Sequence, residues 1–169
     1  MSHNGTQQRV IVTAGGSGIG RAIVDRFVAS GALVHTCDVV PELLEEVIAG
    51  SDCVSGTLAD VGKPTDVENL VAEAVSAMGG IDVLVNNAGI GGPRAALEDV
   101  SYEDWDRTIG VNLNGMFYCI KNVAPHMKAQ NSGCIVNIST ASAKVALPMR
   151  SPYVASKVGV LGLTHTVAR

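Results

Sequence analysis

The chain has 169 residues, of which 47% are hydrophobic and 17% are charged, so it can bury the core of one globular domain and is too apolar to be disordered. Its formal net charge of −4 and the absence of a block of Lys or Arg argue against nucleic acid or an anionic membrane as the main partner. We expect a single domain over 1–169, with a polar tail at 1–8, that binds a small molecule.

The N-terminal residues and the cysteines bear on the cellular location. Residues 1–8 lack the charged and apolar regions of a signal peptide, and no apolar run approaches the ~18 residues that a membrane span needs. We expect a cytoplasmic protein. The cysteines lack metal-ligand spacing, so we expect buried free thiols and no metal site. They are Cys37, Cys53, Cys119 and Cys134.

The first strand-to-helix turn is rich in glycine. An apolar run at 9–13 is followed by four glycines within six residues and then by a helical pattern at 19–30. Such a turn brings backbone N–H groups and a helix N-terminus against an anionic nucleotide. The G-x-G-x-x-G pattern is not met, because Ser17 occupies the place of its second glycine. Taken alone, an ordinary tight turn explains the glycines equally well.

The second predicted strand, 33–37, ends in an acidic residue. Asp38 lies eighteen residues beyond Gly20, about where nucleotide folds place a carboxylate on the adenosine ribose. An isolated Asp at a strand end is usually a turn or cap residue. Combined with the glycine turn, Asp38 predicts NAD rather than NADP, because its charge would repel a 2′-phosphate.

Strands and helices then alternate. Helices are predicted from Pro41 and over 64–78, and strands over 53–58 and 81–85. This βαβ pattern predicts an α/β fold with a doubly wound parallel sheet, covered on both faces, whose ligand site lies at the carboxyl ends of the strands.

The next segment contains two candidate asparagine features. The run Asn86-Asn87-Ala88-Gly89 ends a strand, and by itself it is an ordinary turn. Ser101, with Asp104 three residues on, predicts the cap of a long helix that runs to Met127. Asn112 lies among apolar residues of that helix, so it either makes a local structural bond or belongs to a site.

The last part of the chain carries hydroxyl groups and a Tyr–Lys pair. A strand at 134–138 ends in Ser139-Thr140, and Ser151-Pro152 predicts a helix cap and first helical position. Tyr153 and Lys157 are four residues apart and share one helical face, which alone would suggest an ordinary surface contact.

Together these motifs resemble the classical short-chain dehydrogenase/reductase family from Val10 to the last residue. The resemblance implies a Rossmann-like sheet with strand order 3-2-1-4-5 in the part present, and homodimers or homotetramers at full length. The matching motifs, in order, are Thr13-Ala14-Gly15-Gly16-Ser17-Gly18-Ile19-Gly20, Asp38, Asp60-Val61, Asn86-Asn87-Ala88-Gly89, Asn112, Ser139-Thr140, Tyr153 and Lys157.

Three departures from the family pattern stand out. Ala14 replaces the first family glycine, and we still expect nucleotide binding. The family serine lies thirteen residues before the tyrosine, which here selects Thr140, with Ser139 one place earlier. Family members run to roughly 250 residues. We therefore expect an incomplete domain without the C-terminal strands, and a chain that is not a stable monomer.

The resemblance implies an NAD(P)-dependent oxidoreductase that acts on CH–OH groups of a small alcohol or ketone. Tyr153 would be the general acid/base, assisted by the charge of Lys157, by the hydroxyl of Thr140 on the substrate oxygen, and by Asn112 through a bound water. The implied cofactor-binding residues are Ala14, Gly15, Ser17, Gly18, Ile19, Gly20, Asp38, Asp60, Val61, Asn87, Ala88, Gly89, Tyr153 and Lys157.

A different class of function stays open. The chain could be a non-catalytic nucleotide-binding module or an inactive fragment, as Ala14 and the short length suggest. The sequence does not identify the substrate. Arg94 and Arg150 are possible anion contacts, although arginines are more often surface charges.

Overall fold

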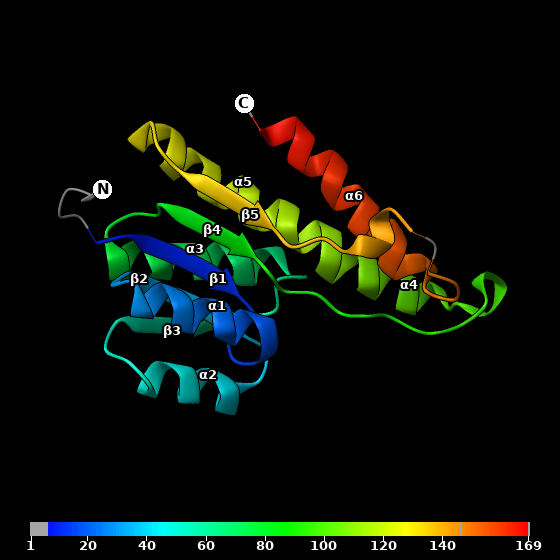
Figure 1. Ribbon diagram of the computed structural model, residues 1–169, viewed down its shortest axis with the longest axis horizontal. Coiled ribbons are helices and arrows are strands. Elements are labelled where there is room, and N and C mark those ends of the chain that lie inside the picture. Colours follow the sequence, from blue (N-terminus) through cyan, green and yellow to red (C-terminus); the bar gives the residue numbers. More distant parts are fainter. Residues whose placement is uncertain (1–6, 146, 169) are drawn as a thin grey trace.

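The protein alternates strands and helices along its whole length (Figure 1). A computed structural model describes residues 7–145 and 147–168. The elements are β1 (Arg9–Thr13), α1 (Gly18–Ala29), β2 (Leu33–Asp38), α2 (Pro41–Ala49), β3 (Val54–Leu58), α3 (Pro64–Met78), β4 (Val83–Asn86), η1 (Leu97–Asp99), α4 (Tyr102–Ile109), η2 (Gly110–Asn114), α5 (Gly115–Gln130), β5 (Cys134–Asn137), η3 (Ala141–Ala143) and α6 (Ser151–Val167).

The five strands form one parallel sheet in the order β3-β2-β1-β4-β5, which confirms the predicted fold. Because every strand runs the same way, their carboxyl ends meet at one edge. The strand arrows point to the end of the molecule where α4 and the start of α6 lie (Figure 1). A ligand site is therefore expected at that end.

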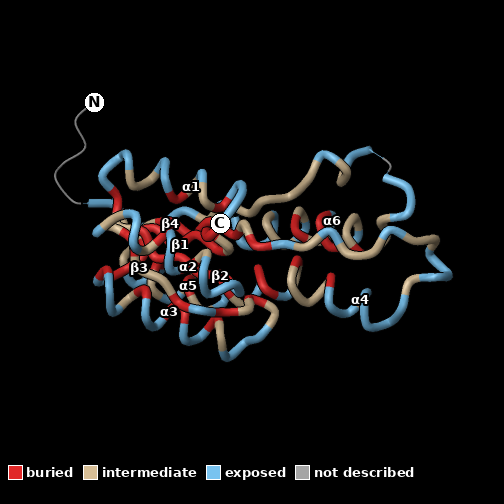
Figure 2. Tube along the Cα trace, turned by 90° about the horizontal axis from the view of Figure 1, so that it is seen from below, coloured by how far each residue is buried: buried red, intermediate tan, exposed pale blue. Residues whose placement is uncertain are grey.

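Helices cover both faces of the sheet, because alternate side chains of each buried strand point to opposite faces. Val10 and Val12 pack with residues of α1 and α2, whereas Ile11 and Leu84 pack with residues of α3 and α5. The buried residues accordingly concentrate along the strands and on the inner sides of the helices (Figure 2). This double-sided burial explains why the strands are apolar runs rather than alternating patterns.

The predicted single helix from Ser101 to Met127 is wrong in one respect. The structure divides it into α4 and α5, separated by a π-helical turn, η2. Asn112 lies in this turn and is fully buried. The widened turn lets Asn112 bond outside its own helix, which regular helical spacing does not anticipate.

The two predicted helix caps have different outcomes. Ser101 caps α4, since its Oγ accepts a hydrogen bond from the N–H of Asp104 at 3.0 Å. The prediction that Ser151 caps the last helix is wrong, because α6 begins at Ser151 and Arg150 holds the N-cap position. The Ser151 hydroxyl is buried without a hydrogen-bond partner among the described residues.

The prediction of buried free thiols holds only for part of the set. Cys37 and Cys119 are buried, Cys53 is half-buried, and Cys134 is exposed on β5. Within residues 7–145 and 147–168, no three His, Cys, Asp or Glu side chains gather as metal ligands would. No helix of this described part is both long and apolar enough to cross a membrane.

Candidate active site

The turn between β1 and α1 is packed too tightly for a side chain at Gly15, Gly16 or Gly20. A Cβ on Gly15 would lie 2.1 Å from Thr36 Oγ1, and one on Gly20 would lie 1.9 Å from the carbonyl oxygen of Ala14. Ala14 and Gly18 have φ values of 55° and 56°. This packing brings the N-terminus of α1 to the carboxyl end of the sheet, where it can receive an anion.

Asp38, at the end of β2, is fixed by backbone groups. Its Oδ2 accepts a hydrogen bond from the N–H of Gly16 at 3.0 Å, and its Oδ1 accepts from the N–H groups of Val39 and Val40 at 2.9 and 3.2 Å. The residue is 8% exposed. It lines a cavity of about 200 Å³ together with Asp60, Val61, Ala88 and Gly89 among others, so these five implied cofactor-binding residues lie together.

The Asn86–Gly89 segment is held against the glycine turn through Thr13. Thr13 Oγ1 accepts hydrogen bonds from the N–H groups of Asn87 and Ala88 at 3.0 and 2.9 Å. The side-chain amide of Asn87 donates to the carbonyls of Thr13 and Ala14 at 3.0 and 3.2 Å. These bonds fix the two loops as a single wall.

A larger cavity of about 910 Å³ opens at the same edge of the sheet. Its lining brings together residues from the glycine turn, the loop after β4, the end of β5 and α6. They are Ala14, Ser17, Ile19, Gly20, Asn87, Gly89, Ile90, Gly91, Arg94, Ile138, Ser139, Leu147, Pro148, Met149, Arg150, Tyr153 and Lys157.

Lys157 is anchored beside Tyr153 in this cavity. Its Nζ donates a hydrogen bond to the carbonyl oxygen of Ile138 at 2.7 Å, and the residue is 4% exposed. Burial lowers the pKa of the Lys157 ammonium. The Lys157 ammonium is thereby held at a fixed point of the cavity, on the same helical face as Tyr153.

Asn112 holds the backbone at the cavity wall. Its Oδ1 accepts from the N–H of Ile90 at 2.7 Å, and its Nδ2 donates to the carbonyl of Ile90 at 2.9 Å and to Ser156 Oγ at 3.1 Å. A Cβ on Gly89 would lie 3.2 Å from Asn112 Oδ1 and 3.4 Å from Lys157 Nζ. Asn112 therefore lies close to the Lys157 ammonium but does not line the large cavity.

The two hydroxyls after β5 have different surroundings. Ser139 lines the large cavity, and its Oγ donates to the carbonyl of Lys157 at 2.9 Å. Thr140, which the thirteen-residue spacing selects, is not among the lining residues. Its Oγ1 accepts from the N–H of Ser142 at 3.2 Å, at the N-cap of η3.

Some contacts of this site carry no signal that sequence reasoning could use. Thr13 opens the glycine motif, but its bonds to Asn87 and Ala88 join positions 74 and 75 residues apart. Ile90 and Ser156 contribute as partners of Asn112. Only the folded sheet edge brings these positions together.

The two cavities together carry the kinds of groups that a dinucleotide would need. They share Ala14, Gly89 and Ile90 in their linings, so they meet at the glycine turn. One end carries the Asp38 carboxylate, the junction has the N-terminus of α1, and the other end carries Tyr153 and Lys157. These groups suit a ribose, a diphosphate and a second ribose, in that order.

Comparison with known proteins finds relatives that are dehydrogenases. The profile of a family described as short chain dehydrogenase matches residues 8–169. The chain is 43% identical over 165 residues to the 2-(R)-hydroxypropyl-CoM dehydrogenase of Xanthobacter autotrophicus, which covers 94% of this chain and 66% of that protein. It is 39% identical over 167 residues to the D-beta-hydroxybutyrate dehydrogenase of Rhizobium meliloti, covering 94% and 63%.

A solved structure, that of NAD⁺-bound xylitol dehydrogenase, is similar with a TM-score of 0.90 at 31% identity, and the match covers 95% of this chain and 64% of that one. The chain thus spans somewhat less than two thirds of the length of most of these relatives. Since the family profile covers nearly the whole chain and the parallel sheet agrees with it, this protein belongs to the short-chain dehydrogenase/reductase family.

Proposed function

We propose that this chain carries the cofactor-binding and catalytic residues of an oxidoreductase that transfers a hydride between NAD(H) and an alcohol or carbonyl substrate. The observation that carries the proposal is that Tyr153 and Lys157 line one cavity with the glycine turn. Membership of the family supports the proposal of an enzyme that acts on CH–OH groups. Because the chain spans about two thirds of its relatives' length, the activity itself is part of the proposal.

The cofactor would be held along the two cavities. Asp38 would bond the adenosine ribose, Asp60 and Val61 would contact the adenine, and the turn at 14–20 would receive the diphosphate. Asn87, Ala88 and Gly89 would contact the inner adenosine and ribose region. When bound, the nicotinamide supplies the hydride acceptor or donor.

The chain's own residues would handle the proton. Tyr153 would take the proton from an alcohol oxygen, or return it to a carbonyl oxygen, as general base or acid. Lys157 would stabilise the phenolate by its charge. Asn112 would act as a positioning residue, since it holds Ile90 and lies beside Gly89 near Lys157.

The decisive test replaces Tyr153 with Phe, which removes one oxygen atom. We expect wild-type protein to reduce NAD with a panel of secondary alcohols and Tyr153→Phe to lose that turnover by at least about 10²-fold. NADH binding, followed by its fluorescence, should persist in the variant. NADH binding without turnover of any alcohol in the wild type would instead favour a non-catalytic nucleotide-binding protein.

Asp38 tests the cofactor preference. Its carboxylate is fixed by three backbone N–H groups and cannot swing away from a 2′-phosphate. We expect kcat/KM to favour NAD over NADP by about 10²-fold, because bringing like charges together costs several kcal/mol. Asp38→Ala should shrink that ratio. A wild-type preference for NADP, or an unchanged ratio in the variant, contradicts the assignment.

We also propose, from the family resemblance, a cytoplasmic protein that forms a homodimer or homotetramer. Fractionation of the source cells tests the location. Sedimentation of the native protein tests the oligomer.

A further inference from the structure

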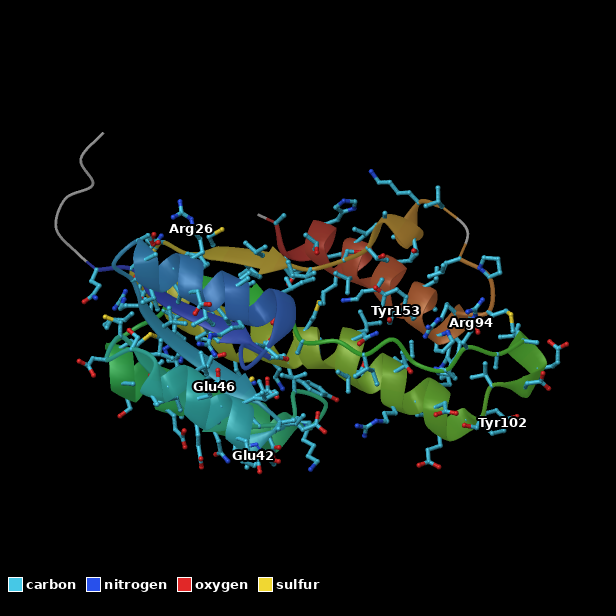
Figure 3. All side chains as sticks on the ribbon, turned by 60° about the horizontal axis from the view of Figure 1, so that its bottom comes forward. Arg26, Glu42, Glu46, Arg94, Tyr102 and Tyr153 are labelled. Atoms are coloured by element: carbon cyan, nitrogen blue, oxygen red, sulfur yellow. The ribbon has the colours of Figure 1, made fainter. Side chains whose placement is uncertain are left out.

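Two arginine-bearing segments form part of the large cavity wall. Residues 91–94 follow β4 and residues 147–150 precede α6, and both segments contribute lining residues. They are tied together, since the N–H of Ala95 donates to the carbonyl of Met149 at 3.1 Å. Figure 3 labels Arg94 and Tyr153 in the same region, beside the first turns of α6.

The guanidinium of Arg150 is fixed to this wall. Its Nη1 donates to the carbonyls of Gly91 and Gly92 at 3.1 and 2.9 Å. Nη2 and Nε donate to no acceptor among the described residues. Arg150 is half-buried at the N-cap of α6, three residues before Tyr153, so a pre-oriented part of its donor fork stays available in the cavity.

The charge of Arg150 is not neutralised within the described chain. By contrast, the partly buried Arg9 and Arg21 pair with Asp82 at 2.7 Å and Asp25 at 3.0 Å. Arg150 and Arg94 have no carboxylate within salt-bridge distance among residues 7–145 and 147–168. A half-buried cation without a counter-ion is unfavourable, and an anion entering the cavity would offset this cost.

The cavity as a whole carries one sign of charge. Its described lining contains Arg94, Arg150 and Lys157 and no Asp or Glu. Walls of one sign concentrate oppositely charged small molecules. A site for a neutral alcohol would gain nothing from two arginines beside the tyrosine.

We infer that the substrate of this site is an anion, a hydroxy acid or its oxo acid, whose carboxylate or similar oxyanion is bound by Arg150 with Arg94 at the mouth of the cavity. The inference rests on the proposed hydride transfer for its chemistry and names the substrate class of that site. Arg150 would bind the oxyanion with the Nη2–Nε side of its guanidinium. The reacting C–O group would then lie toward Tyr153, one helical turn away.

The diphosphate of the cofactor is a poorer partner for these arginines. The glycine turn and the N-terminus of α1 already provide a phosphate site, on the segment between β1 and α1. Arg94 and Arg150 come instead from the segments after β4 and before α6. A cofactor role for Arg150 would appear as weaker NADH binding, which the test below measures.

The test compares matched charged and neutral alcohols. The 2-, 3- and 4-hydroxy isomers of pentanoate, each beside its primary amide, are offered with NAD to the wild type and to Arg150→Met and Arg94→Met. We expect the best acid to exceed its amide in kcat/KM by at least about tenfold. Arg150→Met should lower kcat/KM for acids, mainly through KM, by about 10- to 10²-fold more than it lowers kcat/KM for the matched amides.

Three controls keep the result interpretable. Arg150→Lys retains the positive charge but lacks the planar set of N–H donors of the guanidinium, so it should retain part of the preference for acids. Arg26→Met removes an exposed arginine of α1, away from the cavity lining, and should change nothing (Figure 3). NADH affinity should be the same in all variants. Calorimetric titration of each acid into the protein, alone and saturated with NADH, reports binding when no hydride can move.

Equal use and equal binding of acids and amides by the wild type would overturn the inference. So would an Arg150→Met variant that loses acids and amides equally, or one that loses NADH affinity instead. If no alcohol is oxidised but acids bind and Arg150→Met abolishes that binding, the proposed hydride transfer fails and the anion site stands.

Discussion

Ala14 shows how one residue can carry strain within a glycine-rich turn. It has a φ of 55°, in the left-handed region that glycine adopts freely and alanine does not. The carbonyl of Ala14 meets Gly20 and accepts from Asn87, so the surrounding packing holds it there. The turn therefore closes with alanine where the short-chain dehydrogenase/reductase family has glycine, and the backbone at Ala14 is strained as a result.

We predict that Ala14→Gly stabilises the folded chain by about 0.5–1 kcal/mol, as relief of left-handed strain exceeds the added entropy of the unfolded chain. Urea unfolding without cofactor measures this free energy. Asn131→Gly is the matched control, because Asn131 has a φ of 51° but asparagine tolerates this region. An equal gain at both positions, or none at Ala14, contradicts the account.

The hydroxyls of Ser139 and Thr140 differ in which of them still has a proton to donate. The Ser139 hydroxyl donates to the carbonyl of Lys157, so its proton is committed. Thr140 Oγ1 accepts from the N–H of Ser142 and keeps its own O–H available. A developing negative charge on a substrate oxygen needs a donor. Ser139 is the hydroxyl that lines the cavity. Thr140 is nevertheless the better candidate for the donor to the substrate oxygen, because its O–H is free and it has the expected spacing to Tyr153.

We therefore predict that Thr140→Ala lowers kcat by about 10²–10³-fold, the usual cost of losing such a donor, whereas Thr140→Ser retains most activity. Ser139→Ala should lose far less. Steady-state kinetics on the active protein distinguishes the two hydroxyls. A larger loss in Ser139→Ala would show that the segment between β5 and α6 presents Ser139 to the substrate.

Among the secondary-structure elements, β2, β3 and α3 are joined by a polar network in which His35 and Thr57 are buried and Glu73 is exposed. His35 of β2 contacts Ser55 Oγ through Nδ1 at 2.8 Å and Thr57 Oγ1 through Nε2 at 2.9 Å, and Thr57 donates to Glu73 of α3. Because Thr57 uses its proton on Glu73, it must accept from His35, which assigns the proton to Nε2. Burial lowers the pKa of His35 to about 4.

This network makes the stability depend on pH. The folded pKa of His35, about 4, lies below its ordinary value of 6.5, so the unfolded chain binds the proton more readily. Its stabilising contribution is complete above about pH 6.5 and is lost as the pH falls toward 4. We predict that the free energy of unfolding falls by about 2 kcal/mol more in the wild type than in His35→Gln when the pH is lowered from about 7.5 to about 5. Urea unfolding at both pH values tests this, and parallel losses would exclude the role of His35.

At the scale of the whole molecule, β5 is the exposed edge of the described sheet. It pairs with β4 on one side only, and Val136 is 41% exposed. In Figure 1 it runs along the border of the sheet beside α6. An edge with free N–H and C=O groups and apolar side chains is a template for pairing with another chain.

We predict that the isolated 169-residue chain associates with itself through this edge, and that Val136→Lys reduces the association by placing a charge on it. Sedimentation velocity over a range of concentrations should show growing mass for the wild type and less growth for the variant. Leu58→Lys, on the opposite edge strand β3 with 57% exposure, is the matched control. A wild type that stays monomeric at every concentration contradicts the prediction.

The order of strands and helices, and the edge of the sheet at which the site lies, can be predicted from the amino-acid sequence. Those features depend on periodicity within single segments, such as the apolar run at 9–13, and parallel strands must present their carboxyl ends together. Asp38 and Tyr153 could thus be assigned to one end of the sheet before any contact was known. The strand order came from the family resemblance and agrees with the sheet.

The tertiary structure alone decided the contacts between distant segments. It divides the predicted long helix at the π-turn that holds Asn112, makes Arg150 rather than Ser151 the N-cap of α6, and fixes Arg150 on the carbonyls of Gly91 and Gly92. The last of these contacts joins positions 58 and 59 residues apart. Such contacts depend on how packed elements bring backbone groups within hydrogen-bond reach, and no local pattern of side chains encodes that approach.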